Sequence, residues 1–361
     1  MKDRIRILFT MPNFDKAGSG KVVYDLISGL DQKRFDIELA CNHRRGAFFN
    51  EVEALGFPIH IFKTTTEYKP YQSLPSRIWT ISRFFKKNKY DVIHSWHWSS
   101  DWTEVCAARM AGIKWLYTKK AMSWGNRHWK IRSFLANYIV NINHEMQDYY
   151  PNKKAQALIP LGIDTEHYSP IHFSRTSPKE MFHIITVANL VPVKGIEILL
   201  EAVKMLKDDD WKLTILGNKD NDYGRAMEDL SRNLGLQNKV SFLGKHPDVR
   251  PYISDADLYI IPTLDEGRKE GMPMALVEAM SMAIPVIGSD ISGINYVLKD
   301  FPEWLVPAGN AQALAYAISK LKSRSPNERK AIGVELRNYC LRHFTMAQFI
   351  EAHEELYTQL A

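Results

Sequence analysis

Apolar runs of strand length alternate with stretches of helical periodicity in the first half of the chain. Residues 4–10 predict a strand, a loop containing glycine follows, and residues 22–30 carry apolar side chains at helical spacing. Further strands are predicted at residues 35–41, 58–62, 92–95, 115–118 and 155–160. This alternation is typical of β-α units around a parallel sheet.

A second series follows a polar stretch at residues 169–179, whose two Ser-Pro steps are typical of a linker. Strands are predicted at residues 183–188, 212–216, 240–243, 258–262 and 285–288. Helices are predicted at residues 196–206, 226–234 and 273–282, and an amphipathic helix at residues 346–360.

The 361 residues exceed what one hydrophobic core usually supports. We therefore expect an α/β fold of two Rossmann-like, doubly wound parallel-sheet domains, residues 1–170 and residues 171–345, with the helix at about 346–361 packing back on the first. Open parallel sheets bind ligands beyond the carboxyl ends of their strands, so we expect the site in a cleft between the domains.

Composition and charge narrow the class of protein. With 45% apolar and 24% charged residues, the chain should fold. Its three cysteines are far apart in the sequence, which argues against both disulfides and a zinc site. We find no spanning run of apolar residues and no secretory leader, so we expect a cytoplasmic protein, free or peripheral at the inner face of the plasma membrane. The first 170 residues carry 25 Lys/Arg against 16 Asp/Glu, which favours an anionic surface or ligand there: phospholipid, nucleic acid or phosphorylated substrate.

The most informative segment is EGMPMALVEAM, residues 270–280. Pro273 suits the first turn of a helix, whose unpaired amides bind phosphate well. Glu270 and Glu278 would flank an anion held there, and a carboxylate accepts the paired hydroxyls of a ribose or hexose. The alternative is a solvated loop residue and an ordinary helix charge favoured by the macrodipole.

Other segments occur with this one in a recognisable order. They are VANLVPVKG (187–195), VSFLG (240–244), SDADLYIIPT (254–263) and IPVIGSDISG (284–293), with DVIHSWH (91–97) and IPLGIDTEHYSP (159–170) upstream. In this order the chain resembles, nearly end to end, the retaining family 4 glycosyltransferases with the GT-B fold. The resemblance implies sugar transfer from a nucleotide-diphosphate donor, with retention of configuration and without a metal or other cofactor.

The resemblance assigns roles in the second domain. Lys194 resembles the lysine that pairs with the donor diphosphate, Glu270 the residue that touches the transferred sugar and Glu278 the ribose-binding glutamate. The backbone from Gly271 to Leu276 would bind sugar hydroxyls and phosphate. Asn189 stands where the family usually has arginine, which removes one phosphate cation. The predicted donor-binding residues are Glu278, Asn189, Gly271, Met272, Pro273, Met274, Ala275, Leu276, Gly217 and Lys245, with Lys194 and Glu270 as the catalytic pair.

The first domain should hold the acceptor. Gly18, Ser19 and Gly20 lie in the loop after the first strand, where the resemblance implies glycine for close backbone approach to donor and acceptor; the alternative is a flexible turn. The family commonly has a histidine where this chain has Lys120, so the role of that histidine does not transfer. Two roles are open for Lys120: contact with a phosphate or acidic acceptor, or a contribution to a basic face. His97 is a further candidate, although a single histidine beside aromatics is more often structural.

Two basic stretches with aromatic residues, 77–89 and 119–132, match either an interfacial helix on anionic lipid or a helix that packs on the sheet with a solvated basic side. The DxD spacings at residues 208–210 and 255–257 are better explained by turn and strand positions than by a metal site. The departures at Asn189 and Lys120 also leave open a decayed sugar- or lipid-binding protein.

We therefore predict a glycosyltransferase for lipopolysaccharide, capsule or another cell-surface glycan. It would use a UDP- or GDP-linked sugar and a glycan or lipid-linked acceptor, at an anionic membrane surface if the basic half binds lipid. A nucleotide-sugar epimerase of the same architecture is the enzymatic alternative. Nucleic-acid binding is disfavoured, because the basic half lacks a recognised module.

Overall fold

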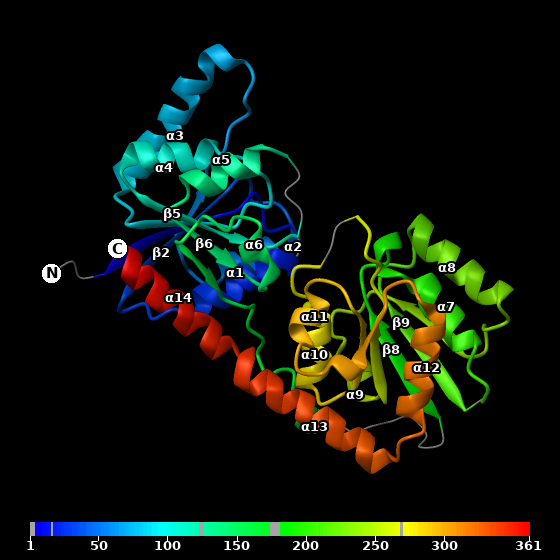
Figure 1. Cartoon of the computed structure of the whole chain (residues 1–361). Helices are drawn as coiled ribbons and strands as arrows, with labels where there is room; N and C mark the ends of the chain where they lie inside the picture. Colours follow the sequence, from blue (N-terminus) through cyan, green and yellow to red (C-terminus); the bar gives the residue numbers. More distant parts are fainter. Residues whose placement is uncertain (1–3, 16, 123–125, 174–180, 209, 268–269) are drawn as a thin grey trace. The chain divides into compact units, whose positions relative to one another are not determined.

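The computed structural model describes residues 4–361 apart from 16, 123–125, 174–180, 209 and 268–269. The chain divides into two compact units (Figure 1): unit 1 contains Met1–Gly162 and Met346–Ala361, and unit 2 contains Ile163–Thr345. The long segment of unit 1 ends eight residues before the expected boundary after residue 170. The predicted linker begins inside unit 2, with a 3₁₀ turn at Pro170–His172, and its residues 174–179 lie outside the described part.

Unit 1 is built on a seven-stranded parallel sheet of order β3-β2-β1-β4-β5-β6-β7. The strands are β1 Ile5–Thr10, β2 Phe35–Cys41, β3 Ile59–Ile61, β4 Val92–Ser95, β5 Lys114–Lys119, β6 Tyr138–Asn141 and β7 Gln156–Leu158. The helices are α1 Ala17–Gly29, α2 Ala47–Glu53, α3 Leu74–Asn88, α4 Thr103–Ala111, α5 His128–Leu135, α6 Glu145–Asp148 and α14 Met346–Leu360.

Apolar side chains on both faces of this sheet explain its helical layers. Alternate residues of a strand point to opposite faces, so Leu8 and Ile93 join the core under α3, α4 and α5, whereas Phe9 and His94 meet Tyr357 of α14. Figure 1 accordingly shows α3, α4 and α5 on one face and α1 with α14 on the other. Residues 346–360 therefore form the predicted helix and belong to unit 1.

Unit 2 is built on a six-stranded parallel sheet of order β10-β9-β8-β11-β12-β13. The strands are β8 Phe182–Val187, β9 Trp211–Leu216, β10 Val240–Gly244, β11 Leu258–Ile261, β12 Val286–Ser289 and β13 Leu305–Val306. The helices are α7 Ile196–Lys204, α8 Asp222–Asn233, α9 Arg250–Ser254, α10 Met274–Ser281, α11 Ile294–Val297, α12 Ala311–Lys322 and α13 Pro326–His343.

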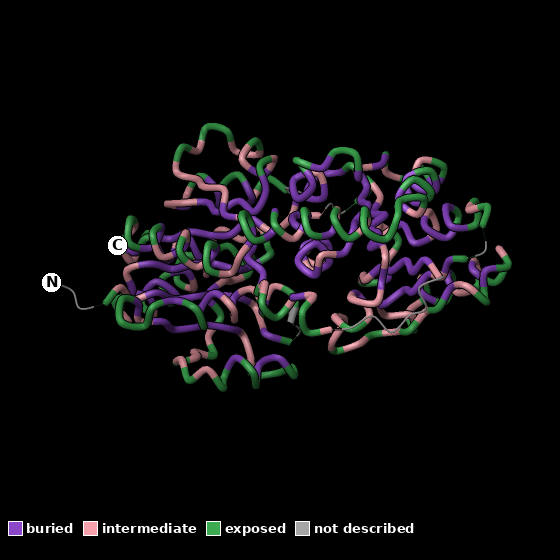
Figure 2. The backbone as a smooth tube through the Cα atoms, turned by 90° about the horizontal axis from the view of Figure 1, so that it is seen from below, coloured by how far each residue is buried: buried purple, intermediate pink, exposed green. Residues whose placement is uncertain are grey.

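Strands β11 and β12 of unit 2 are buried along their whole length, because helices cover both faces of a parallel sheet. Every residue of β11 and β12 is buried, and Figure 2 shows buried strands inside each unit with exposed residues on the outer sides of the helices. Helix α10 packs against α13, and α7 packs against α12. The predicted strands of both units are present; β6 and β13 were not predicted.

Candidate functional site

The loops that carry Lys194 and Glu270 leave the same edge of the sheet in unit 2. Strands β8 and β11 are adjacent and parallel, so the loops that follow them begin side by side. The amide of Leu264 donates to the carbonyl of Val193 at 2.8 Å, which ties the two loops together. Gly195 makes this approach possible: its φ is 62°, and a Cβ there would lie 2.2 Å from the carbonyl oxygen of Pro262.

Lys194 and Glu270 form a direct ion pair. The ammonium of Lys194, at the end of a 3₁₀ turn at Pro192–Lys194, contacts Oε1 of Glu270. The two side chains are 20% and 19% exposed, so the pair is partly open to solvent at the sheet edge. The structure thus brings together the two residues predicted as the catalytic pair, although they are 76 residues apart in the chain.

Glu278 lies in the second turn of α10, which begins at Met274. Pro273 is therefore the N-cap of this helix and not its first residue, because its ψ of 99° is extended. Glu278 is partly buried, and this burial raises the pKa of its carboxyl group to about 7. A hydrogen bond from Tyr168 opposes the rise, since a hydroxyl donor favours the ionised carboxylate.

Tyr259 links the two glutamates electrostatically. Burial raises the pKa of its phenol, and the charges of Glu278 and Glu270 both raise it further. Its hydroxyl donates to the carbonyl of Val187, the last residue of β8, at 3.1 Å. Glu270 and Glu278 therefore act on one buried hydroxyl at the carboxyl edge of the sheet.

Tyr168 reaches Glu278 because its backbone is held against α10. Ser281 of α10 donates its hydroxyl to the carbonyl of Tyr168 at 2.7 Å, and Arg337 of α13 donates to the same carbonyl at 3.1 Å. Neither tyrosine was predicted as a site residue. Tyr168 lies within the motif at residues 159–170, and Tyr259 reads only as part of a buried strand.

The other predicted donor residues lie at the same edge of unit 2 but differ in exposure. Gly271, Met272, Pro273 and Leu276 are buried, Met274 and Ala275 are partly buried, and Asn189 and Lys245 are exposed. Gly217 packs closely on the loop after β8: a Cβ there would lie 2.0 Å from the carbonyl oxygen of Ala188.

The structure corrects part of the predicted glycine loop after β1. Helix α1 spans Ala17–Gly29, so Ser19 and Gly20 lie in a helix and not in a loop, whereas the backbone of Gly18 is not helical. Gly18 is exposed and interrupts the helix with φ 23°, whereas Gly20 is buried, and a Cβ there would lie 3.3 Å from Phe14 and Phe48. Low helix propensity of glycine explains the wrong prediction, and the packing of Gly20 explains its place in the helix.

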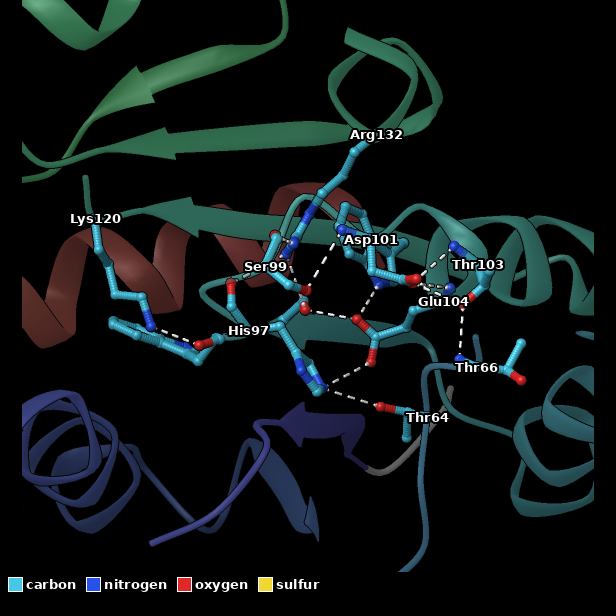
Figure 3. Close-up of polar contacts among 12 residues, drawn as sticks. Thr64, Thr66, His97, Ser99, Asp101, Thr103, Glu104, Lys120 and Arg132 are labelled. Atoms are coloured by element: carbon cyan, nitrogen blue, oxygen red, sulfur yellow. Dashed lines mark hydrogen bonds and ion pairs between the residues drawn. The ribbon is translucent and has the colours of Figure 1, made fainter. Parts of the chain in front are cut away.

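His97 of unit 1 is a buried, neutral member of a polar network. It follows β4, is 5% exposed, and hydrogen-bonds the hydroxyl of Thr64 at 3.2 Å (Figure 3). Burial lowers the pKa of its ring to about 4, although Glu104 at 3.8 Å opposes this shift. These contacts favour the structural interpretation of His97 over a role in binding.

The same network contains two buried charges that the sequence did not indicate. Arg132, 1% exposed, donates to the carbonyl of Ser99 and, at 3.4 Å, to that of His97. Glu104, also 1% exposed, accepts from the hydroxyl of Ser95 at 2.5 Å. Both charges act on the loop at residues 96–101, which begins at the carboxyl end of β4 (Figure 3).

Lys120 lies at the start of the loop after β5. Its ammonium donates to the carbonyl of Trp96 and lies 5.3 Å and 5.8 Å from the ring centroids of Trp96 and Trp98. Lys120 is partly buried, Trp96 is buried, and Trp98 is 52% exposed. Lys120 therefore stands over aromatic rings at the sheet edge.

The two basic aromatic stretches contribute to the core of unit 1. In the first, Ile78, Ile81 and Phe85 of α3 are buried, whereas Trp79 is 51% exposed. In the second, Lys119, Trp129 and Arg132 are buried, so these cations do not form a solvated side; Trp124 lies outside the described residues. Helix packing therefore accounts for most of the apolar side chains.

Among the described residues, no group of three or more His, Cys, Asp or Glu side chains is placed to hold a metal ion. Asp255 lies 3.3 Å from the His183 ring, and Asp208 and Asp210 contact Lys322, while Asp209 lies outside the described part. Within the described part, no helix is long and apolar enough to cross a bilayer.

Two family models match the chain, one in each half. Residues 17–167 match Glycosyltransferase Family 4, and residues 169–338 match Glycosyl transferases group 1. The amylovoran biosynthesis glycosyltransferase AmsK of Erwinia amylovora is 32% identical over 45% of this chain, which spans only 40% of that relative. The Escherichia coli UDP-Gal:alpha-D-GlcNAc-diphosphoundecaprenol alpha-1,3-galactosyltransferase is 22% identical over 92% of this chain and 91% of its own.

Solved structures share the fold over nearly the whole chain. A glycosyltransferase from Rickettsia africae superposes with a TM-score of 0.88 at 18% identity, covering 99% of both chains. Anabaena HepE in complex with UDP superposes with a TM-score of 0.82 at 18% identity, covering 98% of this chain and 100% of its own. The prediction of a GT-B fold with two Rossmann-like parallel-sheet units is confirmed.

Proposed function

Because the chain belongs to family 4 of the glycosyltransferases, we propose that it transfers a sugar from a nucleotide-diphosphate sugar to an acceptor hydroxyl, with retention of the anomeric configuration and without a metal cofactor. The donor would bind unit 2 and the acceptor unit 1. The observation that carries this proposal is the pairing of Lys194 with Glu270 at the sheet edge where α10 begins, with Glu278 on that helix.

Each of these side chains has a role suited to its chemistry. The leaving diphosphate gains negative charge as the glycosidic bond breaks, and Lys194 with the first amides of α10 would stabilise that charge. Glu278, as a carboxylate, would accept the ribose hydroxyls, and Glu270 would accept hydroxyls of the transferred sugar. The departing phosphate would take the proton of the acceptor hydroxyl on the same face, so no side chain is needed as the base.

The acceptor would belong to cell-surface polysaccharide synthesis, as in lipopolysaccharide or capsule. AmsK is named for amylovoran, and the E. coli relative is named for a sugar linked to diphosphoundecaprenol. A glycan or lipid-linked acceptor of this kind is consistent with the basic charge of the first half of the chain.

The protein would act at an anionic membrane surface, the inner face of the plasma membrane. Residues 63–132 contain 14 Lys/Arg against four Asp/Glu, an excess of ten that is larger than the net charge of +6 of the whole chain. In the layer of α3, α4 and α5, the exposed cations are accompanied by exposed apolar side chains: Trp79, Met110, Ile131 and Phe134. Cations near anionic lipid contribute about 1 kcal/mol each.

A transfer assay with a matched pair of variants tests the proposal. A panel of UDP- and GDP-sugars is first screened for thermal stabilisation, and the selected donor is then offered with extracts of lipid-linked acceptors. Glu270→Gln should bind the donor but lose transfer, whereas Glu303→Gln, at an exposed site in the same unit, should retain it. Unchanged transfer in Glu270→Gln would remove the assignment.

The alternatives differ in their products. A nucleotide-sugar epimerase would convert the donor without any acceptor. Nuclear magnetic resonance spectra of the donor incubated with the protein alone detect this conversion. A decayed binding protein would show no turnover of any donor. Calorimetry that detects no binding of a nucleotide diphosphate would favour this alternative. Retention is tested by the anomeric coupling constant of the product, and metal independence by transfer in the presence of EDTA.

A further inference from the structure

Trp98 and Lys120 meet at the carboxyl edge of the sheet in unit 1. Strands β4 and β5 are adjacent and parallel, with Ser95 opposite Tyr117. The loops that follow these strands therefore leave the same edge, and they carry Trp98 and Lys120. The ammonium of Lys120 lies 5.8 Å from the ring centroid of Trp98, close enough for a cation–π contact.

The two indoles beside Lys120 differ sharply in exposure. Trp96 is fully buried and belongs to the core, whereas Trp98 is 52% exposed and keeps a large part of its ring in solvent. An exposed indole next to a cation offers a flat apolar surface and a positive charge together. The C–H face of a sugar ring packs on such a surface, and a phosphate or carboxylate on that sugar would pair with the ammonium.

The loop that carries Trp98 is held in place by hydrogen bonds from the buried polar network of unit 1. Arg132 donates to the carbonyls of His97 and Ser99, the two neighbours of Trp98 (Figure 3). Glu104 accepts from Ser95 at 2.5 Å and from the indole nitrogen of Trp115 at 3.3 Å. A loop held on both sides of its exposed residue loses little entropy on binding, which favours a built site over a mobile loop.

We propose that Trp98 and Lys120 form an acceptor subsite for a sugar bearing an anionic group, with the sugar ring on the indole and the anion on the ammonium. This inference rests on the proposed function, which assigns the acceptor to unit 1. It also gives a reason for lysine at the position where the family commonly has histidine, since an ammonium offers three N–H donors to an anion. Of the two anions, phosphate is the one that the proposed lipid-linked acceptor carries, and its source is either a lipid diphosphate or a phosphorylated sugar.

The test measures binding of soluble probes to the full chain by ligand-observed nuclear magnetic resonance. The probes are N-acetylglucosamine, N-acetylglucosamine 1-phosphate, its diphosphate ester with a short isoprenoid, and inorganic phosphate. We expect the phosphorylated sugar to bind about tenfold more tightly than the neutral sugar, and inorganic phosphate to bind more weakly than the phosphorylated sugar. Tighter binding of the isoprenoid diphosphate identifies a lipid-linked acceptor, and equal binding of the two phosphorylated probes identifies a phosphorylated sugar.

Matched variants separate the two contributions. Lys120→Met should abolish the preference for the phosphorylated sugar, whereas Lys120→Arg should keep it. Lys114→Met removes the same charge from the opposite end of β5, where the lysine is exposed, and should keep the preference. Trp98→Ala should weaken the binding of both sugars about tenfold without weakening the binding of inorganic phosphate. Trp98→Phe should bind the sugars more like the wild type.

Donor binding, measured as thermal stabilisation by a nucleotide-sugar, should stay unchanged in these variants because it belongs to unit 2. A Lys120→Met variant that keeps the preference for phosphate would overturn the inference. So would a Lys120→Met variant that loses donor binding and keeps acceptor binding, because Lys120 would then serve the donor. Failure of the wild type to bind any nucleotide-sugar would instead contradict the proposed function, while probe binding at Trp98 would still be measured.

Discussion

Replacing Glu278 by glutamine should stabilise unit 2 and weaken donor binding at the same time. Burial raises the pKa of the Glu278 carboxyl from 4.5 to about 7 in the folded protein. Between these pH values the folded state binds more protons than the unfolded state, so stability falls as pH rises through this window. Above pH 7 the full cost of the buried charge is present, and glutamine removes it.

The size of this effect follows from the shift in pKa. At 1.36 kcal/mol per pH unit, a rise from 4.5 to about 7 corresponds to ~3 kcal/mol. Glu278 keeps part of its surface in water, which reduces the expected gain of Glu278→Gln at pH 8 to roughly 1–2 kcal/mol. At pH 4.5 the wild type and the variant should be equally stable.

Donor binding should show the opposite dependence on pH. Ribose hydroxyls bind the ionised carboxylate, so wild-type affinity for a nucleotide-sugar should rise about tenfold from pH 6 to pH 8. A nucleotide-sugar is a suitable probe because its diphosphate, esterified at both ends, has no ionisation near pH 7. Glu278→Gln should bind it about 10- to 100-fold more weakly at pH 8, without this dependence on pH.

Hydrogen exchange of the β11 and β12 amides measures the stability of unit 2 directly, after correction for the intrinsic exchange rate. Calorimetric titration measures donor affinity in parallel. If wild type and Glu278→Gln have the same pH dependence of protection and of affinity, the reasoning is refuted, because Glu278 would then titrate outside this window.

Three further predictions concern the same unit. Tyr168→Phe removes the hydroxyl that favours ionised Glu278, so the pH midpoint of donor binding should move above 7; an unchanged midpoint in calorimetry contradicts the role of this hydroxyl. Gly195→Ala adds a methyl group 2.2 Å from the Pro262 carbonyl oxygen, and it should cost roughly 2–3 kcal/mol of unit 2 stability and most of the donor affinity. The control Gly235→Ala is also at positive φ but lacks this contact, so it should cost about 1 kcal/mol. Equal losses of stability in urea unfolding would refute the clash at Gly195. EDTA should leave the transfer rate unchanged, and recovery only on adding a divalent cation would refute metal independence.

The sheets were predictable because buried parallel strands consist of continuous apolar runs. The strands at residues 35–41 and 92–95 have the predicted bounds, and the helix at residues 346–360 follows its amphipathic period. Strand β6 was missed because the apolar run before and through Tyr138–Asn141 also fits a helix, and periodicity does not separate the two for short segments.

The site was predictable only in part. Motif order indicated Lys194 and Glu270 but not their ion pair, because sequence spacing across two loops does not fix the direction of a side chain. Tyr259 gives no signal in a buried strand, where a tyrosine is common. Arg132 and Glu104 were missed for a physical reason as well: lone charges in helices are usually exposed, and only the folded chain shows that both are buried on one loop.

The central claim is that Lys194, Glu270 and Glu278 together bind a nucleotide-sugar. Its most direct test is the electron density of crystals grown with the donor that the panel selects. We expect the diphosphate beside the ammonium of Lys194 and the first amides of α10, the ribose hydroxyls on Glu278 and the sugar beside Glu270. A nucleotide bound elsewhere, with Lys194 still paired only to Glu270 and Glu278 away from the ligand, would contradict the account.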